Sequence, residues 1–123
     1  MKKQATINTT TICKTRITAL KDTMEVLSGK WKFHIIGTLL QSGPMRFMDL
    51  LREVGVAPKM LSKELHDLEV NQLVTRTVLD TKPVTVEYDV TAYGKNLEKV
   101  IDEIAAWGTE YRKAVYKDDK KSR

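Results

Sequence analysis

The chain has 123 residues, 41% of them hydrophobic, which is enough for one compact core but not comfortably for two. Its 21 lysines and arginines outnumber its 16 acidic residues, so the formal net charge is +5, which favours an anionic partner, nucleic acid ahead of a membrane surface. No apolar run approaches the roughly 18 residues of a membrane span, and the single cysteine excludes an internal disulfide.

The N-terminal segment predicts a polar arm followed by one helix. Residues 1–15 lack the apolar centre of a secretory signal, so we expect a cytoplasmic protein. The same residues are expected to form a flexible arm. Beyond it, apolar side chains recur at helical spacing, and Gly29 stands where a left-handed cap residue would end the helix. The apolar positions of this first helix are Ile17, Leu20, Met24 and Leu27.

A second helix is predicted over residues 30–41, because its apolar side chains surround most of the circumference, as at the centre of a small core. His34 lies inside it, where we expect a hydrogen-bonded structural imidazole. No cysteine or carboxylate stands at metal-ligand spacing beside it. No nucleophile, base and orienting group can be assembled from the chain. We therefore predict no metal site, no cofactor and no enzyme.

Two short amphipathic helices follow, over residues 46–54 and 58–71, joined by a tight turn. Pro58 suits the first position of the second one, where its missing N–H needs no partner. This helix turns three leucines toward the core and a cationic, polar face away from it. The leucines are Leu61, Leu65 and Leu68, and the opposite face holds Lys59, Ser62, Lys63 and His66.

After this helix the hydrophobic period becomes that of a strand. Residues 73–80 and 84–90 are rich in β-branched side chains and flank a turn at 81–83, which predicts a β-hairpin over about 74–90. Thr91 is the expected N-cap of one long last helix, and residues 117–123 are an expected disordered, charged tail. The last helix carries a broad apolar stripe made of Leu97, Val100, Ile101, Ile104, Trp107, Gly108, Tyr111 and Val115.

This order of elements outlines a winged helix-turn-helix over residues 16–116, a mainly α fold with a β-hairpin wing. In such a fold the second helix of the pair enters the DNA major groove, where cationic donors suit phosphates and purine edges. Arg76 in the first strand and Lys82 at the turn would place cations on the DNA backbone or in the minor groove.

A purely structural interpretation of the same helix stays open. Any surface helix shows polar residues opposite its leucines, and this one carries Glu64, Asp67 and Glu69, which leave its net charge slightly negative. DNA binding is favoured because these acids are expected on the flanks, while the cations and Ser62 share the outer face. Lys82 alone is explained as well by an exposed lysine that aids solubility.

Five motifs lie in the order and at the spacing of a known family. They are GKW at 29–31, GPMRF at 43–47, APKMLSKELHDLE at 57–69, VEYDVTAYG at 86–94 and AAWG at 105–108. Together they resemble the HxlR-type transcriptional regulators of bacteria, relatives of the MarR-like winged-helix proteins. The resemblance covers about residues 18–108 and implies a DNA-binding homodimer, joined by its first and last helices, on a palindromic operator. It puts Pro58, Lys59, Met60, Ser62 and Lys63 on the recognition helix and Lys82 in the wing.

One departure from the family concerns redox sensing. A cysteine that senses electrophiles or oxidants often stands just before the first helix in this family, but counting back from Gly29 puts Thr18 there. Cys13, farther upstream, is the redox candidate of this chain. The simpler alternative is an unreactive thiol with only Lys14 and Arg16 nearby.

Two further departures lie near the wing. Thr85 replaces an arginine that is common in the family's wing strand, which removes one phosphate contact. Gln72 replaces a glycine after the recognition helix, which leaves the left-handed turn to Asn71.

The last helix also predicts a surface for a partner. Its apolar stripe is broader than one small domain can cover, and uncovered stripes of this kind usually mark interaction surfaces. A two-fold dimer would present two recognition helices to one face of DNA, which predicts a pseudo-palindromic operator. The predicted dimer-interface residues are Ile17, Leu20, Met24, Ile101, Ile104, Trp107 and Tyr111.

Two questions stay open at this point. A winged-helix module that docks proteins without binding DNA is the alternative function, favoured by Thr85 and by the acids on the recognition helix. A small-molecule inducer between the first and last helices is compatible with the pattern, and nothing in the sequence identifies its chemistry.

Overall fold

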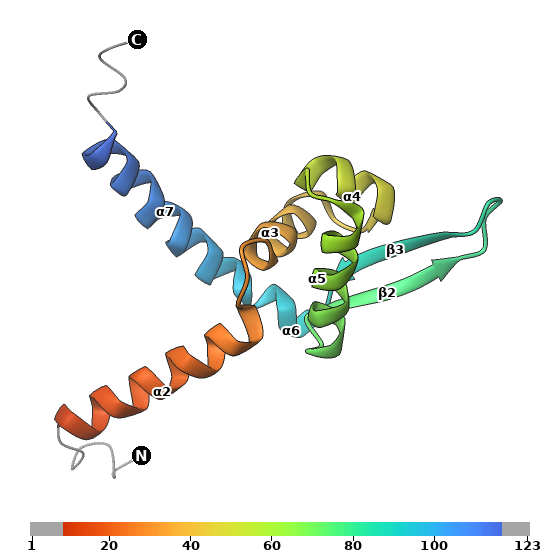
Figure 1. Ribbon diagram of the computed structural model, residues 1–123. Helices are drawn as coiled ribbons and strands as arrows, with labels where there is room; N and C mark the ends of the chain where they lie inside the picture. Colours follow the sequence, from red (N-terminus) through yellow and green to blue (C-terminus); the bar gives the residue numbers. More distant parts are fainter. Residues whose placement is uncertain (1–8, 117–123) are drawn as a thin grey trace.

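The computed structural model describes residues 9–116, so residues 1–8 of the predicted arm and the predicted tail at 117–123 lie outside the described residues. The described chain is mainly helical with a small antiparallel sheet (Figure 1). In chain order its elements are α2 (Thr9–Leu27), α3 (Lys32–Ser42), β1 (Met45–Arg46), α4 (Phe47–Val54), α5 (Pro58–Val70), β2 (Val74–Leu79), β3 (Thr85–Val90), α6 (Ala92–Lys95) and α7 (Leu97–Val115).

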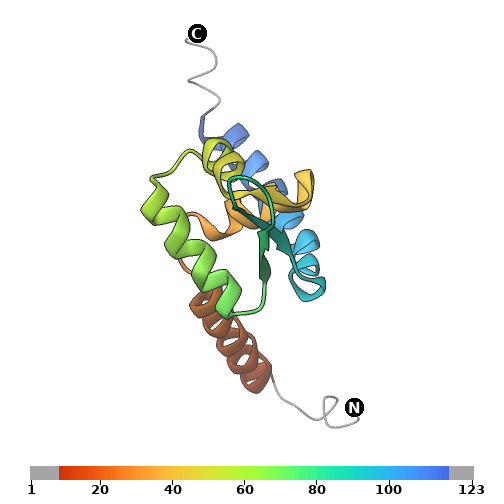
Figure 2. The ribbon, with the colours of Figure 1, turned by 90° about the vertical axis from the view of Figure 1, so that its right-hand side faces the viewer.

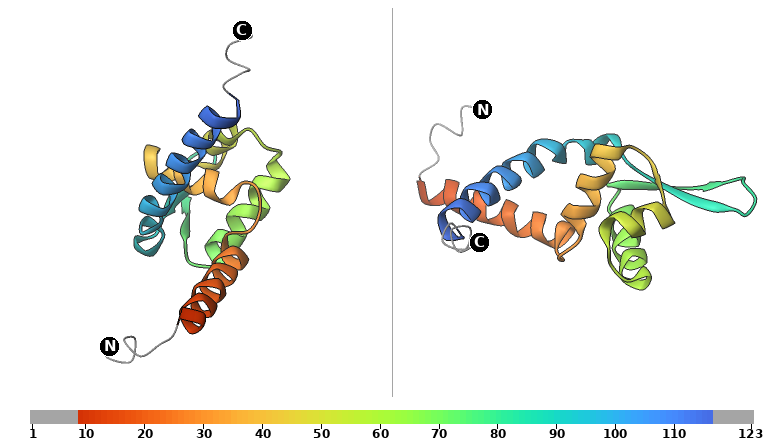
Figure 3. Two further views of the ribbon diagram at one scale, coloured as in Figure 1. Left: turned by 90° about the vertical axis from the view of Figure 1, so that its left-hand side faces the viewer. Right: turned by 90° about the horizontal axis from the view of Figure 1, so that it is seen from above.

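The two longest helices and the hairpin extend in opposite directions from a compact body (Figure 1). α2 and α7 leave one side of the body, and the hairpin of β2 and β3 leaves the other, as the view from above also shows (Figure 3, right). From the side of the hairpin, α5 runs along one side of the body, to the left of the strands (Figure 2). This arrangement confirms the predicted winged helix-turn-helix fold.

The core is built around α3, which packs against α4, α5, α7 and β3. Ile35 and Ile36 are fully buried there. All three leucines of α5 are fully buried as well, so the predicted inward face of this helix is confirmed. α4 adds Leu50, and the sheet adds Val74, Tyr88 and Val90. Because α5 is anchored along one whole face, its opposite face has a fixed direction.

The sheet has one strand more than the predicted hairpin. β1 pairs with β3, with Met45 opposite Tyr88 and Arg46 opposite Glu87, which gives the strand order β1-β3-β2. The helix predicted from Arg46 therefore begins one residue later, at Phe47. A strand of two residues is too short to show an alternating pattern, so periodicity could not reveal it.

Two other boundaries differ from prediction. The flexible arm is wrong for residues 9–15, which continue α2 because no glycine or proline interrupts the helix there. The single last helix is also wrong, because a four-residue helix, α6, precedes α7. Thr91 does cap it, since its Oγ1 accepts a hydrogen bond from the Gly94 amide at 2.9 Å.

The turn after α5 is left-handed at a different residue from the one predicted. Gln72 has a φ of 63°, whereas Asn71 has a φ of −86°. The Asn71 side chain donates a hydrogen bond to the Asp67 carbonyl at 3.0 Å, which holds Asn71 against the helix end. The reversal of the chain therefore falls on the next residue.

Candidate nucleic-acid interface

The outer face of α5 carries the residues predicted to contact DNA. Pro58, Lys59, Met60, Ser62, Lys63 and His66 are all exposed. The N-terminal end of α5 has no side-chain cap, so no capping side chain accepts hydrogen bonds from its first backbone amides. An uncapped helix end of this kind carries partial positive charge, which adds to the cations beside it.

The acids of α5 were predicted on the flanks of the helix, but one of them, Glu64, faces inward. Glu64 is only 5% exposed, and its Oε1 lies 2.5 Å from Nζ of Lys32. Lys32, at the first position of α3, is equally buried. Sequence patterns did not reveal this pair, because Lys32 stands at the start of a largely apolar helix and Glu64 is one of several acids on α5. The pair removes one negative charge from the candidate DNA surface.

A second acid of α5, Asp67, contacts both a buried lysine and an exposed one. Asp67 Oδ2 lies 3.4 Å from Lys32 Nζ and 3.7 Å from Lys63 Nζ. Burial lowers the pKa of Lys32, but hydrogen bonds and charge attraction from Glu64 and Asp67 outweigh burial and raise it overall. Lys32 therefore stays charged at neutral pH, and its contribution to stability is lost only at strongly alkaline pH.

A groove between α5 and the wing gathers two arginines. It has a volume of about 560 Å³, and Arg46, Ser62 and Arg76 are among the polar residues that line it. Arg46 comes from β1, the strand that periodicity missed, and so it was absent from the predicted site. Phe47 and Tyr88 form part of the apolar floor. Two guanidinium groups beside a helix face and a wing suit a phosphate-bearing strand.

The turn of the wing is exposed and internally bonded. Lys82 is exposed at the tip. Thr85, where the resemblance to the family implies an arginine, has its Oγ1 3.0 Å from Oγ1 of Thr81. The same Thr81 hydroxyl donates to the Pro83 carbonyl at 2.8 Å. Thr85 thus helps to close the turn and leaves Lys82 as the cation at the tip.

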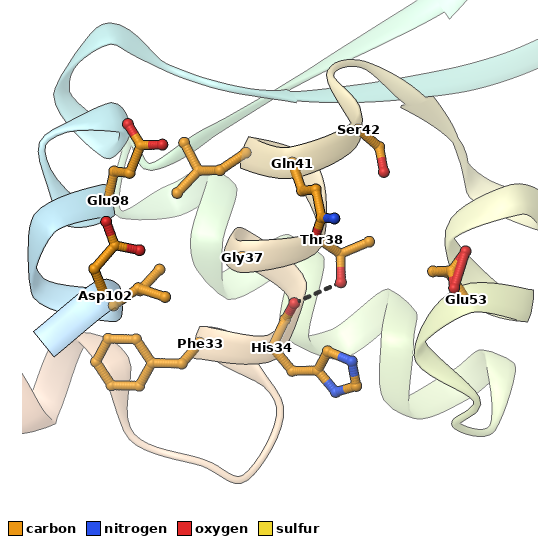
Figure 4. A pocket seen from close by; sticks show the side chains of 11 residues that line it. Phe33, His34, Gly37, Thr38, Gln41, Ser42, Glu53, Glu98 and Asp102 are labelled. Atoms are coloured by element: carbon orange, nitrogen blue, oxygen red, sulfur yellow. Dashed lines mark hydrogen bonds between the residues drawn. The ribbon is translucent and has the colours of Figure 1, made fainter. Parts of the chain in front are cut away.

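A second cleft in the body is lined by acidic residues. A cleft of about 740 Å³ lies between α3 and α7, where Glu98 and Asp102 of α7 face the cleft from one side and Glu53 of α4 from the other (Figure 4). His34, which was predicted to be a hydrogen-bonded structural imidazole, is exposed and lines this cleft. No lysine or arginine lines the cleft among the described residues, so the cleft itself is unfavourable for an anionic polymer.

The predicted partner surface is exposed in the single chain. On α2, Ile17, Leu20 and Met24 are 62, 52 and 46% exposed. On α7, Ile104, Trp107 and Tyr111 are 48, 67 and 46% exposed, and the rings of Trp107 and Tyr111 are stacked with centroids 5.0 Å apart. Ile101 is different, because it is half-buried and packs against the core.

The structure also places the redox candidate and the region predicted for a small-molecule inducer. Cys13 is an exposed thiol on α2. A cavity of about 350 Å³ lies between α2 and the start of α7, lined in part by Leu27, Leu73, Tyr93 and Leu97. Residues 9–116 bring together no group of metal-ligating side chains that could hold an ion. Within the same residues, no helix has both the length and the hydrophobicity of a membrane-spanning segment.

Comparison with known proteins gives a consistent result. The model of the HxlR-like helix-turn-helix family matches residues 26–116. The uncharacterized HTH-type transcriptional regulator YtcD of Bacillus subtilis is 36% identical over 101 residues, which cover 81% of this chain and 79% of YtcD. The redox regulator HypR in its reduced form has a TM-score of 0.74 and 29% identity, covering 80% of this chain and 98% of HypR. A MarR-family regulator from Porphyromonas gingivalis W83 has a TM-score of 0.69 and 33% identity, covering 74% and 89% of the two chains.

Proposed function

The chain belongs to the HxlR-like helix-turn-helix family of transcriptional regulators, and we propose that it binds a specific double-stranded DNA operator as a homodimer. In this proposal α5 enters the major groove and the wing of β2 and β3 lies along the backbone or in the minor groove. The operator is pseudo-palindromic, because a two-fold dimer presents two copies of α5 to one face of the duplex.

The observation that carries the proposal is the division of charge across α5. Lys59 and Lys63 are exposed, whereas Glu64 is buried against Lys32. α5 alone has one acid more than it has lysines. The positive charge of Lys32, which pairs with Glu64 from α3, brings the total to zero. The outer face therefore presents cations to solvent while the compensating acids are partly withdrawn. Arg46 and Arg76 extend the same basic surface toward the wing.

The homodimer is supported by the faces of α2 and α7. Leu20 on α2 and Trp107 on α7 expose more than half of their surface, and both helices leave the body on the side away from the wing. Apolar side chains exposed along two long helices are a typical partner surface. Burial of this surface between two copies would leave both α5 helices free to face DNA.

A direct test is selection of bound duplexes from a randomised DNA pool, followed by salt titration of the selected duplex and a scrambled one. The proposal expects an enriched, inverted-repeat sequence and an affinity that falls steeply with salt, because cations release counterions from phosphates. Enrichment of no sequence, together with no binding to either duplex at low salt, would contradict it.

Lys63→Ala should reduce affinity for the selected duplex by about 1–3 kcal/mol per base contact and relax the preference at one base pair of each half-site. The ammonium of Lys63 is exposed on the outer face, and its only ion pair with a described residue is the 3.7 Å contact to Asp67. Fluorescence anisotropy on a set of duplexes, each altered at one base pair, measures the effect. Lys99→Ala removes an exposed lysine of α7 and should leave the profile unchanged.

Lys82→Ala should weaken binding to the selected and scrambled duplexes to the same extent. A lysine at the tip of the wing meets phosphates rather than base edges, so its removal should lower the slope of log affinity against log salt by about one unit per wing. Titration of both duplexes at several salt concentrations measures this slope. A change in base preference with an unaltered slope would show that Lys82 reads bases instead.

A second candidate function is protein docking through the wing, without DNA. The observation that favours it is the exposure of Val78 and Val84, which are 56 and 63% exposed on the hairpin. Apolar side chains at a wing suit a protein surface better than a phosphate backbone. Absence of DNA binding at low salt, in the titration above, would favour this candidate.

A further inference from the structure

Lys32 joins three separate elements at one atom. Its Nζ donates to Oε1 of Glu64 on α5 at 2.5 Å and to Oδ2 of Asp67 on α5 at 3.4 Å. It also donates to the backbone carbonyl of Ser28, just after α2, at 3.0 Å. The ammonium is thus bound at the same time by the link that directly follows α2 and by the inner face of α5.

Gly29 brings the link after α2 close to the same carboxylate. Its φ of +107° is one that L side chains rarely adopt, and a Cβ added there would lie 3.3 Å from Oε2 of Glu64. The chain therefore passes directly over Glu64 as it turns from α2 into α3. The glycine of the GKW motif has a structural role in this close approach.

α2 has little other attachment to the body of its own chain. Every side chain from 13 to 25 is exposed, and burial begins with Val26 and Leu27. The direction of α2 relative to α5 is consequently set at the C-terminal end of α2, next to the contact between Lys32 and the Ser28 carbonyl. Figure 1 shows α2 otherwise extending into solvent.

A buried ion pair is a weak source of net stability, because the desolvation of two charges offsets most of their attraction. It is, however, strongly directional, since each partner must meet the other at hydrogen-bonding distance. A pair of this kind at a junction between helices is better suited to fixing their relative orientation than to stabilising the fold.

We propose that Lys32 is a positioning residue that fixes the orientation of α5 relative to α2, and so sets the distance and angle between the two recognition helices of the dimer. The inference rests on the proposed function, because α2 is one of the two helices expected to join the copies. A change in the direction of α2, caused by any ligand or modification, would pass through Lys32 to Glu64 on α5.

The test compares Lys32→Met with the double variant Lys32→Met/Glu64→Leu. The single variant leaves a buried carboxylate without its partner and should unfold at a lower temperature. The double variant replaces both charges with apolar side chains of similar size, so the net charge is unchanged and the melting temperature should equal or exceed that of the natural chain. Lys30→Met removes a neighbouring exposed lysine and serves as the control.

Each variant is titrated against the duplex recovered by selection and against a scrambled duplex of the same length. For the double variant we expect the ratio of the two affinities to fall about tenfold while the salt dependence is unchanged, because charge is conserved and orientation is not. The distribution of distances between spin labels on the two copies of α5, attached through Lys59→Cys in a Cys13→Ser background, should broaden.

The outcomes separate the inference from the function on which it rests. A double variant that is stable and retains the natural affinity ratio and label distances would overturn the positioning role while the proposed function stands. Failure of the natural chain to prefer any duplex would overturn the proposed function, and the inference with it. A Lys30→Met variant with the same loss would show that the effect is not specific to Lys32.

Discussion

Gly94→Ala should destabilise the fold by about 3 kcal/mol, a large loss for a single methyl group. A Cβ at this position would lie 2.4 Å from the carbonyl oxygen of Leu73 and 2.7 Å from Cγ1 of Val90. The Leu73 carbonyl accepts a hydrogen bond from the Thr91 amide at 3.0 Å, so it cannot move aside without loss of that bond. Equilibrium unfolding in urea, followed by circular dichroism, measures the change.

Gly37→Ala is the matched control, because Gly37 lies inside α3 and the nearest atom to an added Cβ is Cγ2 of Ile101, at an ordinary contact distance of 3.9 Å. Alanine is the better helix former, so this variant should be unchanged or more stable by up to about 1 kcal/mol. Equal stability of Gly94→Ala and the natural chain would contradict the steric argument. Equal loss in both variants would show that any added methyl group is poorly tolerated.

Gly94 also shows what the sequence could and could not reveal. The motif at 86–94 indicated that this region matters, and Thr91 was correctly predicted as an N-cap. The reason for the glycine is a contact with Leu73, which is 21 residues away in the chain, and local periodicity carries no information about such contacts. For the same reason the short α6 was merged with α7 in the prediction.

α4 and α5 were predictable because each of these helices buries one regular face. The leucines of α5 recur at four- and three-residue spacing, and this spacing alone fixed which side of the helix faces the core. The exposure of Lys59 and Lys63 followed from it. Lys32 and Glu64 were not predictable, because a lysine near a helix start and a glutamate on a polar helix look exposed until their partner is known.

Arg46 was missed for a related reason. Two residues of strand leave no periodic pattern, and only the pairing of Arg46 with Glu87 on β3 brings this arginine to the groove beside Ser62. Tertiary pairing, rather than local preference, thus decides which cations share a surface with α5. The general outline of the candidate interface follows from sequence, whereas its charge balance follows only from the three-dimensional structure.

Ile104→Glu should convert the proposed dimer into a monomer and reduce affinity for the full selected duplex by about 10²–10⁴-fold, because linked binding of two half-sites is lost. In a two-fold interface one substitution introduces two carboxylates into the same apolar contact. Ile104 is 48% exposed in the single chain, so the core should be preserved. Sedimentation velocity gives the mass, and anisotropy on full and half-site duplexes gives the affinities.

The half-site duplex decides between loss of dimerisation and damage to the reading surface. Affinity for a single half-site should be unchanged in Ile104→Glu, because α5 and the wing lie on the far side of the body from α7 (Figure 1). Ile104→Leu keeps an apolar side chain of the same size and should remain a dimer with full affinity. An Ile104→Glu protein that stays dimeric, or a monomer that binds the full duplex as tightly as the natural chain, would rule out the α7 surface as the joint between the two copies.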